Sequence, residues 1–146
     1  MTGTYLQIPL QDGSFGYGRV LQNPYIAFYN YRTDKPSSDL DMIDLQPILF
    51  KQAVRFRNEN NWVDIGIKPL DVELTKPIVT FMQDLADFKK CTIFDSEGLE
   101  QNVSPEDCIG LERAEVWESF HIEQRLLDTF QGKENIAEMY ARVRLE

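Results

Sequence analysis

The sequence has 146 residues, of which 42% are hydrophobic and 27% charged, and it carries a formal net charge of −9. This length and composition predict one globular domain over residues 1–146 and exclude an intrinsically disordered chain. No apolar run approaches the roughly 20 residues of a membrane-spanning helix, and the N-terminus lacks the basic and apolar regions of a signal peptide, so we expect a cytoplasmic protein.

The first third of the sequence is typical of β-strands. Residues Tyr5–Leu10 and Ser14–Leu21 flank an Asp12-Gly13 pair, a pattern that predicts a β-hairpin. Glycines at alternate positions of the second strand indicate a bend, a bulge or a close approach of another segment. A third strand is expected over Tyr25–Tyr31, followed by a polar loop over residues 33–41.

Four further strand patterns follow in the middle of the chain. They cover Ile48–Arg57, Trp62–Ile67, Ile78–Met82 and Cys91–Phe94. Each is a short apolar or alternating run bounded by turn residues or proline, which favours strands over helices.

The C-terminal third is predicted to be helical. Ser104-Pro105 has the pattern of a helix start, and a main helix is expected from about Glu112–Glu115 up to Gly132. A short final helix is expected over Ile136–Val143. Because strands come first and helices last, the sequence predicts an α+β fold. In this fold a twisted antiparallel N-terminal sheet, with a barrel-like form as an alternative, packs against the main helix.

On the predicted main helix, one apolar arc carries Val116, Trp117, Phe120 and Leu127 and is expected to be buried, and one acidic residue interrupts it. Glu123 projects into the middle of that arc, where an isolated carboxylate would cost several kcal/mol unless it is paired, hydrogen-bonded or protonated. Arg19, Arg55 and Arg57 lie in predicted strands and are candidate partners. We expect a buried structural ion pair between Glu123 and Arg19, because the glycines before Arg19 would let the helix approach closely. The alternative is that Glu123 is a functional polar group that lines a cleft.

The negative charge is concentrated near the C-terminus. Residues 1–94 hold 11 acids and 10 bases, whereas residues 95–146 hold 13 acids and 5 bases. An acidic field of this kind repels nucleic acid and anionic membranes and attracts a basic partner, although acidic surfaces also serve solubility alone.

The residues that could support catalysis are few. His121 is the one histidine, and Cys91 and Cys108 are the only cysteines, a set that does not match zinc-ligand spacing. No nucleophile elbow or phosphate-binding loop is present. We therefore expect neither a metal nor a cofactor, no catalytic residue and reduced cysteines in the core.

Two blocks of sequence resemble the immunity protein 26 family. The blocks are IPLQDGSFGYGRVL with YIAFY near the N-terminus, and CIGLERAEVWESFHIEQRL over Cys108–Leu126. The resemblance implies a bacterial antidote that binds a cognate toxin protein of a polymorphic or contact-dependent system. The positions that it marks in this chain are Gly18, Gly110, Leu111, Glu112, Trp117, His121 and Arg125.

Two functions are consistent with these observations. The first is a non-catalytic immunity protein that binds a toxin with a basic surface. It binds neither nucleic acid nor membranes, and the sequence does not specify its oligomeric state. Its candidate toxin-binding residues are Glu112, Glu115, Glu118 and Asp128. The alternative is a small-molecule-binding or enzymatic domain with a cleft between the glycine-rich hairpin and the main helix. Its candidate cleft residues are Gly18, Trp117, His121 and Arg125.

Overall fold

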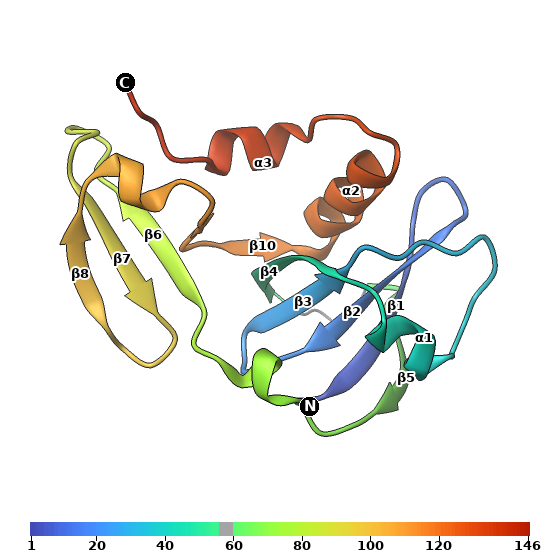
Figure 1. Cartoon of the computed structure of the whole chain (residues 1–146). Helices are drawn as coiled ribbons and strands as arrows, with labels where there is room; N and C mark the ends of the chain where they lie inside the picture. The colour runs from blue at the N-terminus through green and yellow to red at the C-terminus, as the bar shows by residue number, and fades with distance from the viewer. Residues whose placement is uncertain (56–59) are drawn as a thin grey trace. The chain divides into compact units, whose positions relative to one another are not determined.

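The structure is a computed structural model that describes residues 1–55 and 60–146 (Figure 1). Contacts divide the chain into two compact units. Unit 1 comprises Met1–Thr75 and Val116–Asn135, and unit 2 comprises Lys76–Glu115 and Ile136–Glu146. The expectation of one domain over residues 1–146 stays a prediction.

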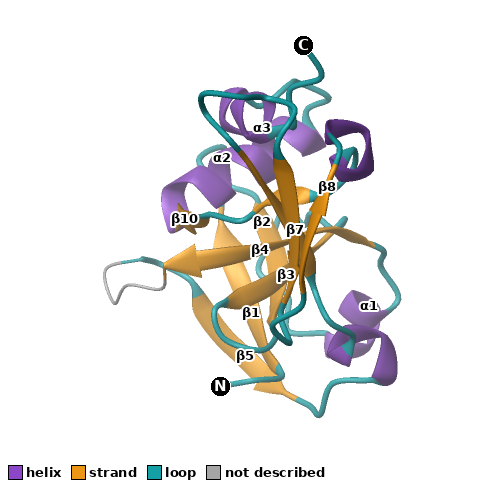
Figure 2. Cartoon of the chain, turned by 90° about the vertical axis from the view of Figure 1, so that its left-hand side faces the viewer, coloured by secondary structure: helices purple, strands orange, loops and turns teal. Residues whose placement is uncertain are grey.

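Unit 1 is built on a six-stranded sheet. Across the sheet the strands are β10 (Val116–Glu118), β4 (Ile48–Arg55), β3 (Tyr25–Tyr29), β2 (Phe15–Val20), β1 (Thr4–Pro9) and β5 (Val63–Ile67). All neighbouring strands are antiparallel except β10, which runs parallel to β4. The strand direction turns from β4 to β5, as expected for a twisted sheet (Figure 2). Within the described residues the sheet is open and not a closed barrel, and the α+β class is confirmed.

The predicted hairpin joins β1 and β2. Tyr5 pairs with Arg19 at one end of the ladder and Pro9 with Phe15 at the other. In the turn, Gly13 has a φ of 87°, a left-handed conformation that favours glycine. The turn chemistry of the sequence therefore fixes the register of these strands.

The two faces of the sheet are covered by different helices. On one face, Tyr17 and Tyr29 form a buried cluster with Ile43 of the short helix α1 (Leu40–Asp44). The sequence pattern does not predict this helix, since it indicates a loop over residues 33–41. On the other face lies α2 (Ser119–Phe130). A side chain added at Gly16 would come within 3.2 Å of Leu126, so the glycine allows α2 to pack closely on β2.

The main helix is shorter than the sequence pattern predicts. It begins at Ser119 and not near Glu112–Glu115, because Val116–Glu118 pair with β4 as strand β10. Its C-terminal end agrees with the prediction, since Gly132 adopts a left-handed φ of 70° just beyond it. The late start leaves Phe120 in the first helical turn, where 61% of its surface is exposed.

Unit 2 contains a smaller sheet. Its strands are, in order, β8 (Glu100–Val103), β7 (Cys91–Asp95), β6 (Val79–Gln83) and β9 (Glu112–Arg113), with only the β6–β9 pair parallel. Two 3-10 helices lie at Val72–Thr75 in unit 1 and Pro105–Cys108 in unit 2, and α3 covers Ile136–Ala141. Phe81, Cys91 and Cys108 form the buried core of this unit.

Candidate functional site

A cleft of about 550 Å³ opens in unit 1 where the hairpin meets α2. The sequence predicted a cleft between these two segments, but most of the lining residues differ from the predicted ones. The cleft is lined by Pro9, Leu10, Gln11, Asn61, Phe120, His121, Glu123, Gln124 and Leu127. The hairpin supplies one wall, and the exposed edge of α2 supplies the other.

Glu123 lies half-buried in this cleft and is held by a neutral partner. Its Oε2 atom accepts a hydrogen bond of 2.9 Å from the indole Nε1–H of Trp62. The Trp62 ring is itself 8% exposed and stands edge-on to Phe28, with 5.9 Å between the ring centroids. The helix is thus connected to Trp62, which precedes β5, through a hydrogen bond between an indole and a carboxylate.

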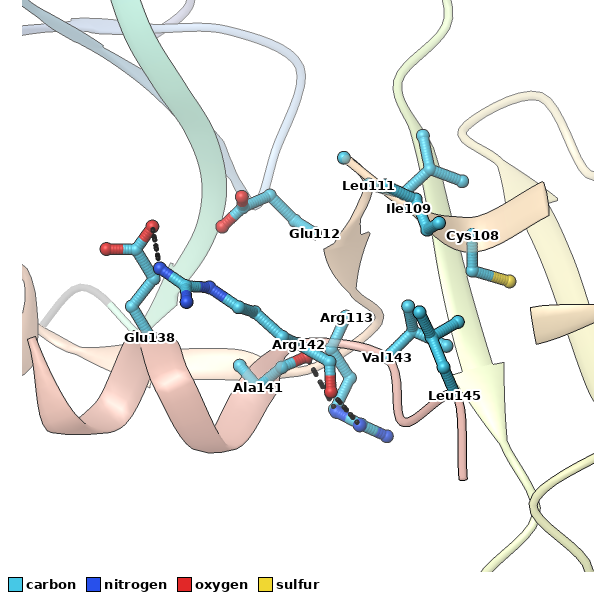
Figure 3. Close-up of a pocket in the computed structure, with 11 residues that line it drawn as sticks. Cys108, Ile109, Leu111, Glu112, Arg113, Glu138, Ala141, Arg142, Val143 and Leu145 are labelled. Carbon is cyan, nitrogen blue, oxygen red and sulfur yellow. Dashed lines mark hydrogen bonds and ion pairs between the residues drawn. The ribbon is translucent and has the colours of Figure 1, made fainter. Parts of the chain in front are cut away.

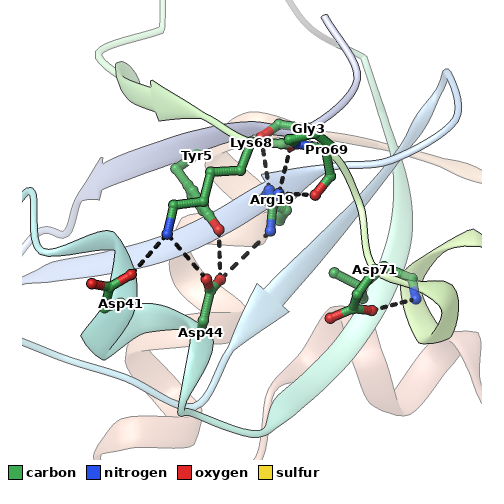
Figure 4. A network of polar contacts seen from close by, with 9 residues as sticks. Gly3, Tyr5, Arg19, Asp41, Asp44, Lys68, Pro69 and Asp71 are labelled. Carbon is green, nitrogen blue, oxygen red and sulfur yellow. Dashed lines mark hydrogen bonds and ion pairs between the residues drawn. The ribbon is translucent and has the colours of Figure 1, made fainter.

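The predicted pair between Glu123 and Arg19 is wrong. Arg19 is 3% exposed, and its Nε atom donates to the carbonyl oxygen of Gly3 at 2.7 Å (Figure 4). Its Nη2 atom donates to the carbonyl oxygen of Lys68 at 2.7 Å, and its Nη1 atom lies 3.6 Å from Oδ1 of Asp44. Arg19 follows Gly18 in β2, so its side chain projects from the α1 face, opposite the face that α2 covers.

The same network binds the first strand to α1. The hydroxyl of Tyr5 donates to Asp44 at 2.6 Å, and the Arg19 guanidinium lies 3.8 Å from the Tyr5 ring centroid (Figure 4). Burial, with the Asp44 hydrogen bond as a second cause, raises the pKa of Tyr5 above its ordinary value. Arg19 is therefore a structural cation of unit 1.

Of the other two arginine candidates, Arg55 pairs with a different acid. Arg55 forms an ion pair with Glu118 at 3.1 Å, and its side chain is 57% exposed. Arg57 lies outside the described residues. Glu123 thus has Trp62 as its hydrogen-bond partner within the part of the chain that the structure describes.

Three of the four predicted cleft residues, Trp117 of β10 and His121 and Arg125 of α2, lie close together. The rings of Trp117 and His121 lie 6.3 Å apart, and the Arg125 guanidinium lies 5.2 Å from the Trp117 ring and 3.6 Å from the Phe50 ring. Trp117 and Arg125 are buried, and of the predicted set only His121 lines the cleft. Gly18 is buried in β2 against β3, where an added side chain would meet Ile26 and Phe28.

Phe120 is the cleft residue that the sequence analysis missed. Its ring lies 4.2 Å from the His121 ring, and together they form an exposed aromatic edge beside the cleft. The helical projection counted Phe120 as core because it assumed a longer helix. The signal available in the sequence was that Phe120 directly precedes His121, a predicted cleft residue.

The candidate toxin-binding acids are distributed over both units. Glu112 in β9 and exposed Glu115 belong to unit 2, whereas Glu118 in β10 and Asp128 in α2 belong to unit 1. Asp128 accepts hydrogen bonds from Gln124 and Asn135, at 2.8 and 2.9 Å. A role for these acids in toxin binding stays a prediction.

A second cavity, of about 400 Å³, lies within unit 2 beside α3 (Figure 3). Its lining is mainly apolar and includes Leu111 and Val143. Arg113 donates to the carbonyl oxygens of Ala141 and Arg142, both at 3.2 Å, and so satisfies the C-terminal end of α3. Nη2 of Arg142 also lies 3.9 Å from Oε2 of Glu138. Both arginines therefore stabilise the C-terminal segment.

The two cysteines of unit 2 lie in its core. Cys91 and Cys108 are both buried and free. Burial, reinforced by the neighbouring Cys91, raises the pKa of Cys108 to about 11, so its thiol stays protonated at neutral pH. In the described part of the chain, no three His, Cys, Asp or Glu side chains gather as metal ligands would. None of its helices is long and apolar enough to cross a membrane.

The comparisons with known proteins give one result. The family model described as Immunity protein 26 matches residues 1–92. The match covers β1 to β6 and the start of β7, and so includes the hairpin wall of the cleft but not α2. No curated protein and no solved structure matches the chain.

Proposed function

The chain belongs to the immunity protein 26 family, and on this premise we propose that it binds and neutralises a cognate bacterial toxin without catalysing a reaction. The family match is the observation that carries this proposal. The raised pKa of the Cys108 thiol supports it, because that thiol is a poor nucleophile.

We further propose that the toxin presents a basic surface and that the complex forms in the cytoplasm, without nucleic acid or membrane. The acidic excess supports this, since residues 95–146 hold 13 acids and only 5 bases. Opposite charges on two proteins raise the association rate and select partners, even where each exposed pair adds little affinity. Glu115 is exposed and is therefore the candidate acid best placed for such steering.

The direct test is co-expression with the protein encoded immediately upstream in the genome of origin. The proposal predicts that this protein stops growth when expressed alone and that the chain restores growth. It also predicts that the two proteins purify together at a fixed ratio. Growth arrest that the chain does not relieve, with no co-purification, would contradict the proposal.

A second candidate function is small-molecule binding in the hairpin–α2 cleft, and the existence of that cleft favours it. The cleft combines apolar side chains with the carboxylate of Glu123 and several amides. A thermal-shift screen against a metabolite library would support this function if one compound stabilises the protein and the Leu127→Ala variant no longer responds. A screen without such a compound would count against it.

A further inference from the structure

We propose that the hairpin–α2 cleft receives an arginine side chain of the partner protein, whose guanidinium pairs with Glu123. This inference rests on the proposed toxin-binding function and adds a docking point with a defined chemistry. It concerns the cleft residues of unit 1 and does not depend on the candidate acids Glu112 and Glu115.

The negative charge of Glu123 favours a cationic ligand in the cleft. Glu123 is the only described lining residue with a formal charge at neutral pH, so the cleft is anionic. The indole Nε1–H of Trp62 donates a hydrogen bond of 2.9 Å to Oε2 of Glu123, whereas Oε1 accepts no hydrogen bond from another described residue. A half-buried carboxylate with one oxygen fixed and one available is a preorganised acceptor for a charge-assisted hydrogen bond.

The apolar side chains around Glu123 favour a cation with a long aliphatic stem and a planar charged group. Phe120 is 61% exposed at the edge of the cleft, whereas Leu10 and Leu127 are 5% and 7% exposed in its wall. An arginine side chain places its aliphatic stem on such apolar side chains and its planar guanidinium over an aromatic ring. A lysine ammonium is more strongly hydrated and lacks this planar stacking surface, so the geometry favours arginine.

Three side-chain amides of the cleft can accept hydrogen bonds from the remaining N–H groups of a guanidinium. Gln11, Asn61 and Gln124 line the same cleft and carry side-chain carbonyl oxygens, which accept hydrogen bonds. A guanidinium has five N–H donors, more than a single carboxylate can accept. The lining therefore offers acceptors for these donors as well as the charge.

A titration with N-acetyl-arginine methylamide tests the cleft without any toxin. Amide chemical shifts are followed by NMR, with N-acetyl-norleucine methylamide as an uncharged probe of similar length. We expect saturable shifts at Phe120, His121 and Glu123 with the arginine probe only. Glu123→Gln keeps an acceptor for Trp62 but removes the charge, so it should abolish the saturation, whereas Glu115→Gln should not. Equal responses to both probes, or an unchanged response in Glu123→Gln, would overturn the proposal.

A second measurement uses the complex with the upstream-encoded toxin. We expect Glu123→Gln and Phe120→Ala each to weaken the affinity by about tenfold, because the first removes a charge-assisted hydrogen bond and the second a cation–π contact. If the toxin binds wild type and both variants equally, the arginine site is wrong and toxin neutralisation stands. If wild type itself does not bind, the proposed function fails, and the docking of a toxin arginine fails with it.

Discussion

The indole of Trp62 donates a hydrogen bond to Oε2 of Glu123 across 61 positions of sequence, with 2.9 Å between the two atoms. This contact joins the segment that enters β5 to the middle of α2. It also explains why a carboxylate can occupy the apolar arc of the helix. The side chain lies half-buried at the border of the cleft, where one oxygen meets a fixed donor.

The Trp62–Glu123 contact should contribute measurably to stability. Trp62→Phe keeps an aromatic ring beside Phe28 but removes the donor and part of the buried surface. We expect it to lower the free energy of unfolding by about 2–3 kcal/mol in urea denaturation. Glu123→Gln, which retains an acceptor, should cost about 1 kcal/mol or less. Equal losses in the two variants would show that the hydrogen bond is not the relevant contact.

Arg19 should contribute far more to the free energy of unfolding than an exposed arginine does. Arg19→Met leaves the carbonyl oxygens of Gly3 and Lys68 without their donor and Asp44 without its cation. We expect a loss of about 3–5 kcal/mol in the free energy of unfolding, as for other broken buried charge networks. The matched control is Arg55→Met, which removes a surface ion pair and should cost about 0–1 kcal/mol. Similar losses at both positions would refute a structural role specific to Arg19.

The local features of this fold could be predicted from sequence, whereas the long-range pairings could not. Asp12-Gly13 specifies a hairpin turn and Gly132 a helix end, because both depend on backbone conformation at single residues. Strand β10 was missed because Val116 and Trp117 fit a helical pattern, and only their pairing with Ala53 and Val54 makes them a strand.

The same distinction applies to the candidate site. The sequence correctly indicated that Glu123 needs a partner, but not which residue supplies it. Strand alternation places Arg19 opposite Gly18, yet the sequence does not reveal which face of the sheet α2 covers. Trp62 was expected only as part of a strand, so its role as a donor depended on tertiary structure.

Stability should fall at alkaline pH partly through Cys108. The pKa of its thiol is raised from 9.0 to about 11 by burial and by Cys91, so the folded state favours the protonated form. The corresponding stabilisation is complete below pH 9 and is lost as the pH rises towards 11. We expect unfolding free energies measured between pH 8 and 10 to decline less steeply in Cys108→Ala than in wild type. Parallel slopes would mean that Cys108 does not contribute.

Electrostatic steering should appear in the association rate. Glu115→Lys should slow association with the toxin in stopped-flow measurements and leave the dissociation rate almost unchanged, because an exposed charge acts mainly on encounter. Asp34→Lys changes the net charge equally at a side chain that is 83% exposed, and it controls for the effect of overall charge. The rate for wild type should also fall with added salt. An association rate that is independent of salt would argue against steering.

The central claim is neutralisation by stoichiometric binding, and a titration of the activity of the purified toxin tests it most directly. The chain is added in increasing amounts to a fixed amount of the upstream-encoded toxin. We predict that the activity falls in proportion to the added chain and reaches its minimum at a fixed stoichiometric ratio. Full toxin activity at a large excess of the chain would contradict binding, and loss of activity at a small fraction of equivalence would show that the chain acts as an enzyme.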